Sequence, residues 1–362
     1  MRLFQNSGIH SSYRHRLDQL STGDVDFESR RRTLVNDRFG ALHFLKPALD
    51  GDSDAFFTNG DDAKLQHAWA RQRGMSERGL EEILLAQIEE HRTEVFYNTD
   101  PTRFDSAFVR RLPACVKKTI CWRAAPLAGA DLSAYGIVVC NFPSILADWQ
   151  RRGWRTAYFS PAIDPVMDEY LDRDRTIDIL FVGAYTRHHS MRVKVLEAVA
   201  ALGQKFNVVY CLDVSRLSRV AETPAGLFIP QLRKLRRPAA VRSVAKPAVF
   251  GRDLYDLIGR AKIVLNGAID MAGRDRGNMR CFEAMGCGAL LLSDAGEYPK
   301  GMRDRETMVA YEGAEQAVQL ALNFLSDDEK RNSISTEGRD TVRKLYNKSA
   351  QWALFTEIVS SI

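Results

Sequence analysis

The chain has 362 residues, of which 45% are hydrophobic and 27% are charged, and its formal net charge is +5. This length suits two domains better than one core, and the ordinary composition excludes a disordered or fibrous class. The mild basic excess suits an anionic small molecule as well as a polymer, so it gives no argument for nucleic acid.

Targeting and redox signals point to the cytoplasm. No apolar run reaches the ~18 residues of a membrane span, and the N-terminus is too short and polar for a signal peptide. The six cysteines contain no Cys-x2-Cys pair and several lie in apolar runs, which favours buried free thiols over disulfides or zinc. We therefore expect a cytoplasmic protein.

The first part of the chain is predicted to be a Rossmann-like α/β domain. A strand over 2–5 leads through a glycine turn into a helix over 11–20, the usual start of such a domain, but no Gly-x-Gly-x-x-Gly supports a dinucleotide site. Residues 50–74, rich in Asp, Gly and Asn, are expected to loop. A helix over 76–91 and strands over 94–97, 118–122 and 136–140 are predicted to follow.

Two residues of this first part follow predicted strands or turns and are candidates for accepting a proton. These are His10, after the glycine turn, and Asp100, at the carboxyl end of the strand over 94–97. Site residues collect at such ends in parallel sheets. The alternative for His10 is a structural role, which is the commoner one for a lone histidine after a turn.

The second part opens after a Pro-Ala-x-Asp-Pro segment near residues 161–165. Residues 177–185 are predicted to form a strand followed by a glycine turn, and a helix to residue 202 comes next. The missing side chain of Gly183 lets the backbone approach a ligand. The N-terminus of that helix is a predicted anion site. His188, just before this helix, is a candidate for contact with a diphosphate or for a role as a general acid. The alternative is that His188 is an exposed residue of the capping turn.

The most basic tract lies between residues 216 and 249, where arginines and lysines alternate with prolines. One interpretation is a solvated loop. The other is docking on anionic lipid through residues 231–246, which would place the protein peripherally at the inner face of the membrane.

Residues 276–294 carry the strongest local signal for a site. A helix is predicted from 279 to 287, ended by Gly286 and Gly288, and a buried strand follows over 289–292. The N-terminus of this helix at Asn278 should attract a phosphate. Arg280 adds a guanidinium group that can donate two hydrogen bonds. Glu283 lies on the same face of the helix and can accept hydrogen bonds from hydroxyl groups.

The neighbouring strand ends supply further candidates. Asn266 and Gly267 follow a predicted strand over 262–265, and Ser293 follows the strand over 289–292. Strand-end turns and donor contacts are both consistent with these residues.

From residue 250 to residue 346 the chain resembles the C-terminal half of GT-B glycosyltransferases, especially the CgeB-like, glycosyltransferase family 1-like group. The resemblance rests on Asn-x-Arg-x-Phe-Glu-Ala over 278–284 with Cys-Gly at 287–288. Asp275 and Glu283 also resemble the Glu-x7-Glu signature of retaining members, with aspartate at the first position. The resemblance implies that Glu283 holds the ribose hydroxyls and that Arg280 holds the diphosphate.

This resemblance implies an α/β fold of two Rossmann-like domains facing across a cleft. Residues 1–160 would bind the acceptor, residues 161–346 the nucleotide-sugar donor, and a C-terminal helix over 347–362 would pack back on the first domain. The expected donor-binding residues are Gly183, Asn266, Gly267, Asn278, Arg280, Glu283 and Ser293. The catalytic candidates are Asp275, His10, Asp100 and His188.

The expected function is transfer of a sugar from a nucleotide diphosphate sugar to a polysaccharide, glycolipid or other glycan precursor. We expect no metal and no other cofactor, because no Asp-x-Asp lies at a strand end and a helix end with an arginine neutralises a leaving diphosphate. The sequence is consistent both with retention and with inversion of the configuration at the anomeric carbon of the sugar. The alternatives are a silent nucleotide-sugar-binding or surface-layer protein, and an epimerase or hydrolase on the same scaffold.

Overall fold

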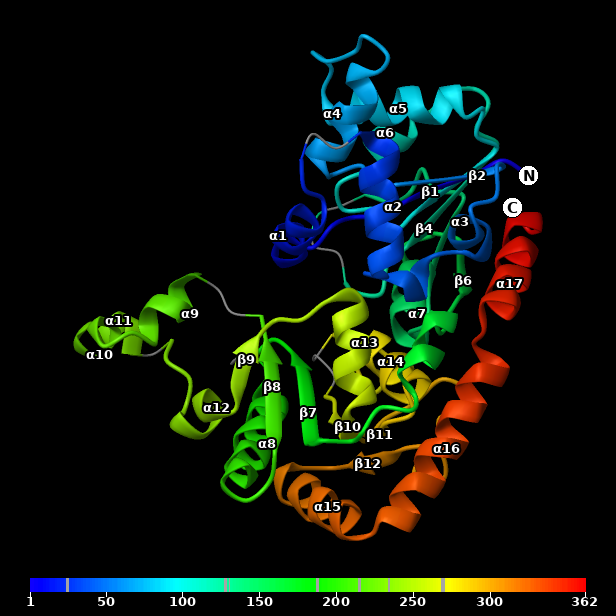
Figure 1. Ribbon diagram of the computed structural model, residues 1–362. Coiled ribbons are helices and arrows are strands. Elements are labelled where there is room, and N and C mark those ends of the chain that lie inside the picture. The colour runs from blue at the N-terminus through cyan, green and yellow to red at the C-terminus, as the bar shows by residue number, and fades with distance from the viewer. Residues whose placement is uncertain are drawn as a thin grey trace. The chain divides into compact units, whose positions relative to one another are not determined.

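The chain folds into two compact units (Figure 1). The computed structural model describes residues 1–23, 26–126, 129, 131–186, 189–213, 216–233, 235–267 and 271–362. The first unit comprises Met1–Asp164, Met271–Asp275 and Tyr346–Ile362, and the second comprises Pro165–Asp270 and Arg276–Leu345.

The first unit is built on a parallel sheet of six strands in the order β2-β1-β3-β4-β5-β6. The strands are β1 (Leu3–Asn6), β2 (Ala55–Thr58), β3 (Val95–Asn98), β4 (Lys118–Trp122), β5 (Ile137–Cys140) and β6 (Thr156–Tyr158). The helices are α1 (Ser11–Leu20), α2 (Phe27–Asp37), α3 (Lys46–Asp50), α4 (Ala63–Arg71), α5 (Leu80–Glu90), α6 (Ser106–Val109), α7 (Pro143–Arg151) and α17 (Lys348–Ser360), with a 3-10 turn η1 (Ala41–His43). All strands run parallel, so their carboxyl ends share one edge.

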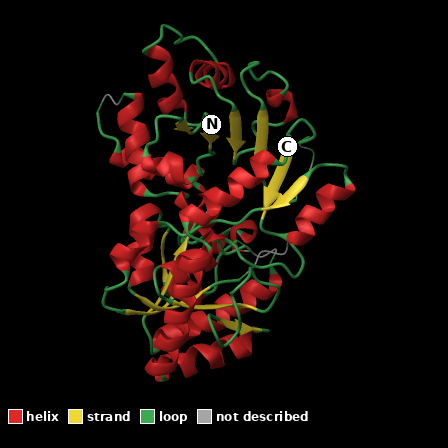
Figure 2. Cartoon of the chain, turned by 90° about the vertical axis from the view of Figure 1, so that its right-hand side faces the viewer, coloured by secondary structure: helices red, strands yellow, loops and turns green. Residues whose placement is uncertain are grey.

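The central strands are apolar enough to be buried on both faces. All four residues of β3 and of β5 are buried, as strands covered on both sides by helices must be. Helices accordingly lie on both sides of the strands (Figure 2). Helix α7 turns Ile145, Leu146 and Trp149 into the same core, and α5 adds Leu84 and Ile88. This packing fixes the positions of the loops at the strand ends.

The prediction of a loop over residues 50–74 is wrong, because this segment contains β2 and α4. Hydrophobic burial outweighs the polar composition here. The ring of Phe56 stacks on Phe4 of the neighbouring strand at 4.9 Å, and Leu65 and Trp69 of α4 are almost fully buried. These apolar residues are too widely spaced among polar ones to show a clear period.

The second unit has its own parallel sheet, in the order β12-β11-β10-β7-β8-β9. The strands are β7 (Ile177–Gly183), β8 (Val208–Leu212), β9 (Ala245–Pro247), β10 (Ala261–Leu265), β11 (Leu290–Asp294) and β12 (Val309–Tyr311). The helices are α8 (Ser190–Ala200), α9 (Arg216–Ala221), α10 (Ala225–Phe228), α11 (Pro230–Arg233), α12 (Ala239–Ser243), α13 (Gly251–Gly259), α14 (Met279–Gly286), α15 (Ala314–Ser326) and α16 (Asp328–Leu345), with 3-10 helices η2 (Pro165–Tyr170) and η3 (Ala201–Gln204).

The α/β prediction with two parallel, Rossmann-like sheets is confirmed. The helix expected over 279–287 is α14, and the strand behind it is β11. The interpretation of residues 216–249 as a loop is wrong, since most of this tract is helical. In the part of the chain that the structure describes, no helix is long and apolar enough to span a bilayer.

Candidate active site

Three of the predicted donor-binding residues meet at the carboxyl edge of the second sheet. Asn266, after β10, donates its Nδ2–H to Oγ of Ser293 in β11 at 3.0 Å. Its Oδ1 accepts a hydrogen bond from Nδ2 of Asn278 at 3.2 Å. Asn266 and Ser293 are buried, so this network joins two strand ends to the start of α14.

The backbone N–H groups at the N-terminus of α14 donate no hydrogen bond to the side chain of the cap residue, Asn278. Asn278 occupies the cap position with extended backbone angles, and its Oδ1 accepts from the Cys281 thiol at 3.6 Å but from no backbone N–H of the first turn. Because that side chain is turned toward Asn266, the helix end is oriented for another acceptor. A helix N-terminus of this kind favours an anion.

Two ion pairs flank this helix end. Arg276 Nε lies 2.5 Å from Oδ2 of Asp294, and Arg280 Nη1 lies 2.6 Å from Oε2 of Glu283. The side chains of Arg280 and Glu283 are only 16% and 9% exposed. Nε of Arg280 is buried and has no hydrogen-bond partner among the described residues. A buried N–H group without an acceptor costs free energy, which a bound phosphate oxygen would recover.

Arg192 of α8 is the main residue that the sequence argument missed. A Cβ atom built on Gly183 would lie 2.6 Å from Nη2 of Arg192, and one built on Gly267 would lie 3.4 Å from its Cγ. The Arg192 side chain therefore lies against the ends of β7 and β10, with Cζ of its guanidinium group 5.1 Å from the centre of the Phe181 ring. The only signal in the sequence is its position in the helix that follows Gly183.

The charge of Arg192 is poorly solvated. Burial lowers its pKa, and the nearby charge of Arg280 lowers it further, while Tyr311 and Asp294 act in the opposite direction. Its Nε is buried and has no hydrogen-bond partner in the described part of the chain. Two incompletely paired guanidinium groups thus lie near each other, an arrangement that an anion would stabilise.

Tyrosine side chains fix the backbone around this edge. The hydroxyl of Tyr311 donates to the carbonyl oxygen of Asn266 at 2.6 Å, and that of Tyr298 donates to the carbonyl oxygen of Asp294 at 2.6 Å. Burial raises the pKa of both hydroxyls, so they remain donors. The strand ends are therefore held in place before any ligand binds.

Asp275 belongs to the first unit, whereas Glu283 belongs to the second. Its Oδ2 accepts hydrogen bonds from the backbone N–H of Ser144 at 2.7 Å and from the Ser144 hydroxyl at 2.6 Å. Ser144 lies in the first turn of α7, so the carboxylate stabilises the N-terminus of that helix. Asp275 thus has structural partners, and its catalytic role stays a prediction. His188 lies outside the described residues.

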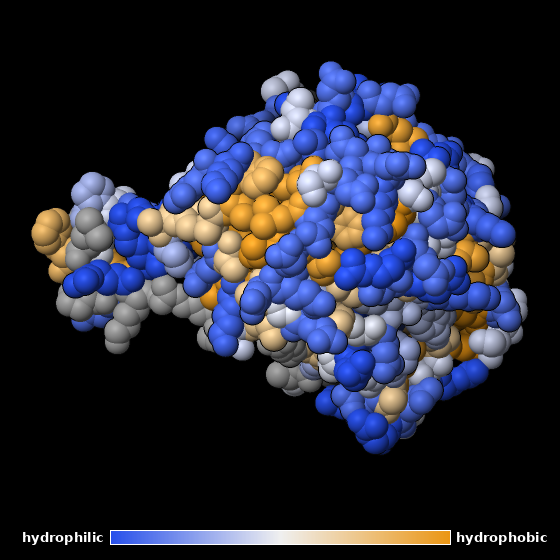
Figure 3. Space-filling view, turned by 90° about the horizontal axis from the view of Figure 1, so that it is seen from below, coloured by the Kyte–Doolittle hydropathy of each residue, from blue (hydrophilic) through white to orange (hydrophobic). Residues whose placement is uncertain are grey.

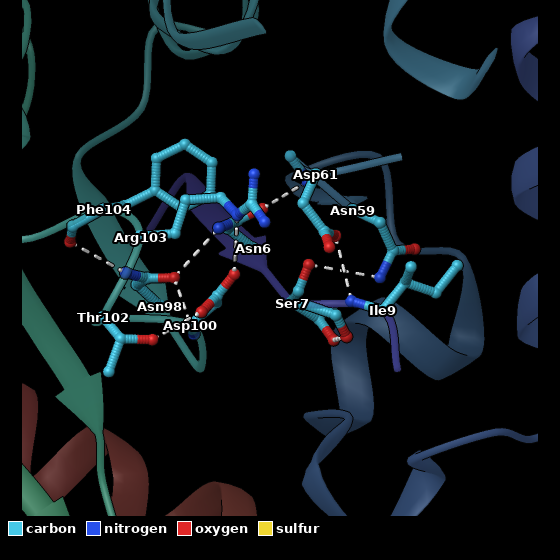
Figure 4. A network of polar contacts seen from close by, with 12 residues as sticks. Asn6, Ser7, Ile9, Asn59, Asp61, Asn98, Asp100, Thr102, Arg103 and Phe104 are labelled. Carbon is cyan, nitrogen blue, oxygen red and sulfur yellow. Dashed lines mark hydrogen bonds and ion pairs between the residues drawn. The ribbon is translucent and has the colours of Figure 1, made fainter. Parts of the chain in front are cut away.

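His10 and Asp100 both follow strands of the first sheet. Nδ1 of His10 accepts a hydrogen bond from the backbone N–H of Ser12 at 3.4 Å at the start of α1. Asp100 accepts from the Thr102 hydroxyl at 3.2 Å, and a Cβ atom on Gly8 would lie 2.9 Å from its Oδ2. Figure 4 shows Asp100 among the polar side chains that gather where β1, β2 and β3 end.

Asp61, after β2, is a second residue that the sequence argument did not select. It is 7% exposed, and its Oδ1 accepts the backbone N–H of Ile9 at 2.9 Å (Figure 4). Burial raises the pKa of this carboxyl, and the charge of Asp100 raises it further, although Arg14 and Arg103 oppose the shift. A carboxyl with a raised pKa at a strand end is suited to proton transfer.

Among the described residues, no group of three or more His, Cys, Asp or Glu side chains is placed to share a metal ion. The positive groups at the second sheet's edge are guanidinium groups and a helix end.

The fold is that of the GT-B glycosyltransferases. The chain is similar over its full length to HepE of Anabaena, whose structure was solved in complex with UDP, with a TM-score of 0.61 and 10% identity over 100% of both chains. It is also similar to sucrose-phosphate synthase from Thermosynechococcus elongatus, with a TM-score of 0.55 and 12% identity over 100% of this chain and 99% of that one.

A glycosyltransferase from Rickettsia africae matches with a TM-score of 0.54 and 11% identity, over 99% of this chain and 97% of that one. Residues 224–356 match the family model described as "Glycosyl transferase-like". No curated protein sequence matches the chain. The glycosyltransferase resemblance that the 278–288 pattern indicated is therefore confirmed over residues 224–356.

Proposed function

We propose that this protein is a glycosyltransferase that moves a sugar from a nucleotide diphosphate sugar to a glycan or lipid-linked acceptor, such as a precursor in polysaccharide biosynthesis. The observation that carries the proposal is the edge of the second sheet, where Arg192, Arg280 and the start of α14 lie together. The C–O bond between the sugar and the diphosphate of the donor breaks, and negative charge builds on the diphosphate. These groups are suited to stabilising that charge without a metal ion.

The donor is proposed to bind the second unit through the predicted residues and Arg192. Arg280 and Arg192 bind the diphosphate, while Gly183 and Gly267 keep the strand ends open beside the Arg192 side chain. Glu283 accepts hydrogen bonds from the ribose hydroxyls, and its pairing with Arg280 orients both side chains. UDP-sugars are the first donors to test, since HepE was solved with UDP and with UDP-glucose.

The acceptor is proposed to bind the first unit at the ends of β1, β2 and β3. A transferase that inverts the anomeric centre needs a base to take the proton of the acceptor hydroxyl. Asp61 is the strongest candidate, because it combines burial with a raised pKa and has Asp100 as its neighbour. His10 and Asp100 remain alternatives, and Asp275 remains the candidate for a retaining enzyme.

The test is incubation with UDP-, GDP-, TDP- and CMP-sugars, with and without a mixture of glycan and lipid-linked acceptors, in the presence of EDTA. The proposal predicts nucleotide release that depends on both one donor and an acceptor, and that EDTA leaves unchanged. Release without acceptor would instead indicate a hydrolase or epimerase. Binding of a nucleotide sugar with no release under any condition would indicate a silent binding protein.

A further inference from the structure

The net positive charge of the chain is concentrated in one segment. Residues 216–246 contain eight lysines and arginines and a single acidic residue, Glu222, which gives a formal charge of +7. The whole chain carries +5, so the remaining residues together carry −2. The net positive charge of the chain therefore resides in this segment, which favours its approach to a negatively charged surface.

Some of these arginines hold the segment together. Nη1 of Arg236 donates to the carbonyl oxygens of Ala221 at 2.9 Å and Thr223 at 3.2 Å. Arg237 forms two hydrogen bonds with Glu222, at 2.5 and 2.6 Å. These contacts fasten the chain after α11 to the end of α9. The one carboxylate of the segment is thereby neutralised, while Arg219 and Arg233 remain exposed.

Apolar side chains are exposed beside these charges. Phe228 is 84% exposed, the largest value among the exposed large hydrophobic residues of the described chain, and Val220, Ile229 and Leu235 are 48%, 43% and 42% exposed. Helices α9, α10 and α11 extend away from the strands of the second unit (Figure 1). Figure 3 shows apolar residues at the far end of this extension. Water-exposed clusters of this kind mark interaction sites.

We infer that helices α9–α11 and the chain to residue 237 form a membrane-docking element that binds an anionic lipid bilayer. Phe228 and Ile229 insert between the lipids at the level of the head groups, and Arg219 and Arg233 bind lipid phosphates. A bilayer is favoured over a protein partner because it offers both surfaces at once, a negative layer and an apolar layer beneath it. The inference does not depend on which sugar is transferred.

The test is sedimentation of the full chain with phosphatidylcholine vesicles, with and without phosphatidylglycerol. We expect binding only with phosphatidylglycerol, and weaker binding as the salt concentration rises. Phe228→Ser and the double change Arg219→Ser, Arg233→Ser should each lower the bound fraction about tenfold. Leu20→Ser, at a residue that is 46% exposed in the first unit, is the matched control and should bind as the unchanged protein does.

Two further measurements separate docking from other effects. A Phe228→Trp variant should show a blue-shifted fluorescence on anionic vesicles, because the indole leaves water. UDP binding in solution should be the same for Phe228→Ser and the unchanged protein. Equal sedimentation of Phe228→Ser and Leu20→Ser would overturn the inference. So would a dimer that Phe228→Ser converts to a monomer, since the exposed residues would then bind a second copy.

Discussion

At the scale of single residues, the candidate donor site depends on where two glycines leave room for one arginine. Gly183 and Gly267 both border Arg192, and neither is needed for a left-handed backbone angle. Their common property is the absence of a side chain beside the Arg192 side chain. We therefore ascribe their role to space, which the sequence motif alone did not indicate.

Gly183→Ala tests this role. The new Cβ atom would lie 2.6 Å from Nη2 of Arg192, so the guanidinium group must move. We expect the KM for the donor to rise about tenfold or more, because a displaced charge-assisted hydrogen bond is worth ~1.5–3 kcal/mol. The control is Gly313→Ala in the same unit, where a Cβ atom meets nothing within 4 Å. An unchanged KM in Gly183→Ala would contradict the role.

Asp61 gives a prediction for the pH dependence of transfer. A general base must be deprotonated, and burial raises the pKa of Asp61 above its ordinary value. Activity should therefore fall with decreasing pH at a value above the ordinary ~3.9 of aspartate. Asp61→Asn should lower kcat about 10²-fold to 10⁴-fold and remove this acid limb. A profile for Asp61→Asn that matches the unchanged protein would exclude it as the base.

The same scale shows what the sequence could and could not predict about the site. Asn266, Asn278 and Ser293 were predicted one by one from their positions at strand and helix ends, and they share one hydrogen-bonded network. Arg192 and Asp61 were missed, because local patterns do not show which polar side chains become buried. Burial is set by contacts between segments that are distant in the sequence.

At the scale of elements, the glycines at the helix end and the apolar run after them predicted the bounds of α14 and β11 closely. Gly288 ends the helix region with a φ of 70°, a left-handed angle that suits glycine. The 50–74 segment was mispredicted because its strand and helix are short and their stabilising contacts come from elsewhere. Phe56, for example, packs on Phe4 of β1.

Helix α17 supplies a prediction about stability. Nζ of Lys348 is buried and donates to the carbonyl oxygens of Ala41, Leu42 and Phe44 at 2.7, 3.1 and 2.8 Å. In Lys348→Met the carbonyls of Ala41 and Leu42 keep the backbone donors of Phe44 and Ala162. The Phe44 carbonyl loses its lysine donor, at a cost of ~1–3 kcal/mol. We expect a lower midpoint of denaturant unfolding. Lys64→Met, at an exposed lysine of the same unit, should have little effect, and equal midpoints for the two variants would contradict the prediction.

At the scale of the whole molecule, the fold class could be predicted because two runs of alternating strands and helices specify two parallel sheets. The likeness to HepE at 10% identity shows that this architecture is shared with little sequence in common. What the sequence does not specify is the acceptor. That recognition is proposed to lie in the strand-end loops of the first unit, which lie outside residues 224–356 and their family match.

The central claim is that the carboxyl edge of the second sheet binds the diphosphate of a nucleotide sugar. Isothermal titration calorimetry of UDP against the full chain, its Arg192→Ala and Arg280→Ala variants, and an Arg260→Ala control tests it most directly. Arg260 precedes β10, so it stands at the amino end of the same strand that Asn266 follows. The account predicts that UDP binds, that each of the first two changes weakens binding about tenfold or more, and that Arg260→Ala does not. Absence of UDP binding, or equal affinity in all four proteins, would contradict it.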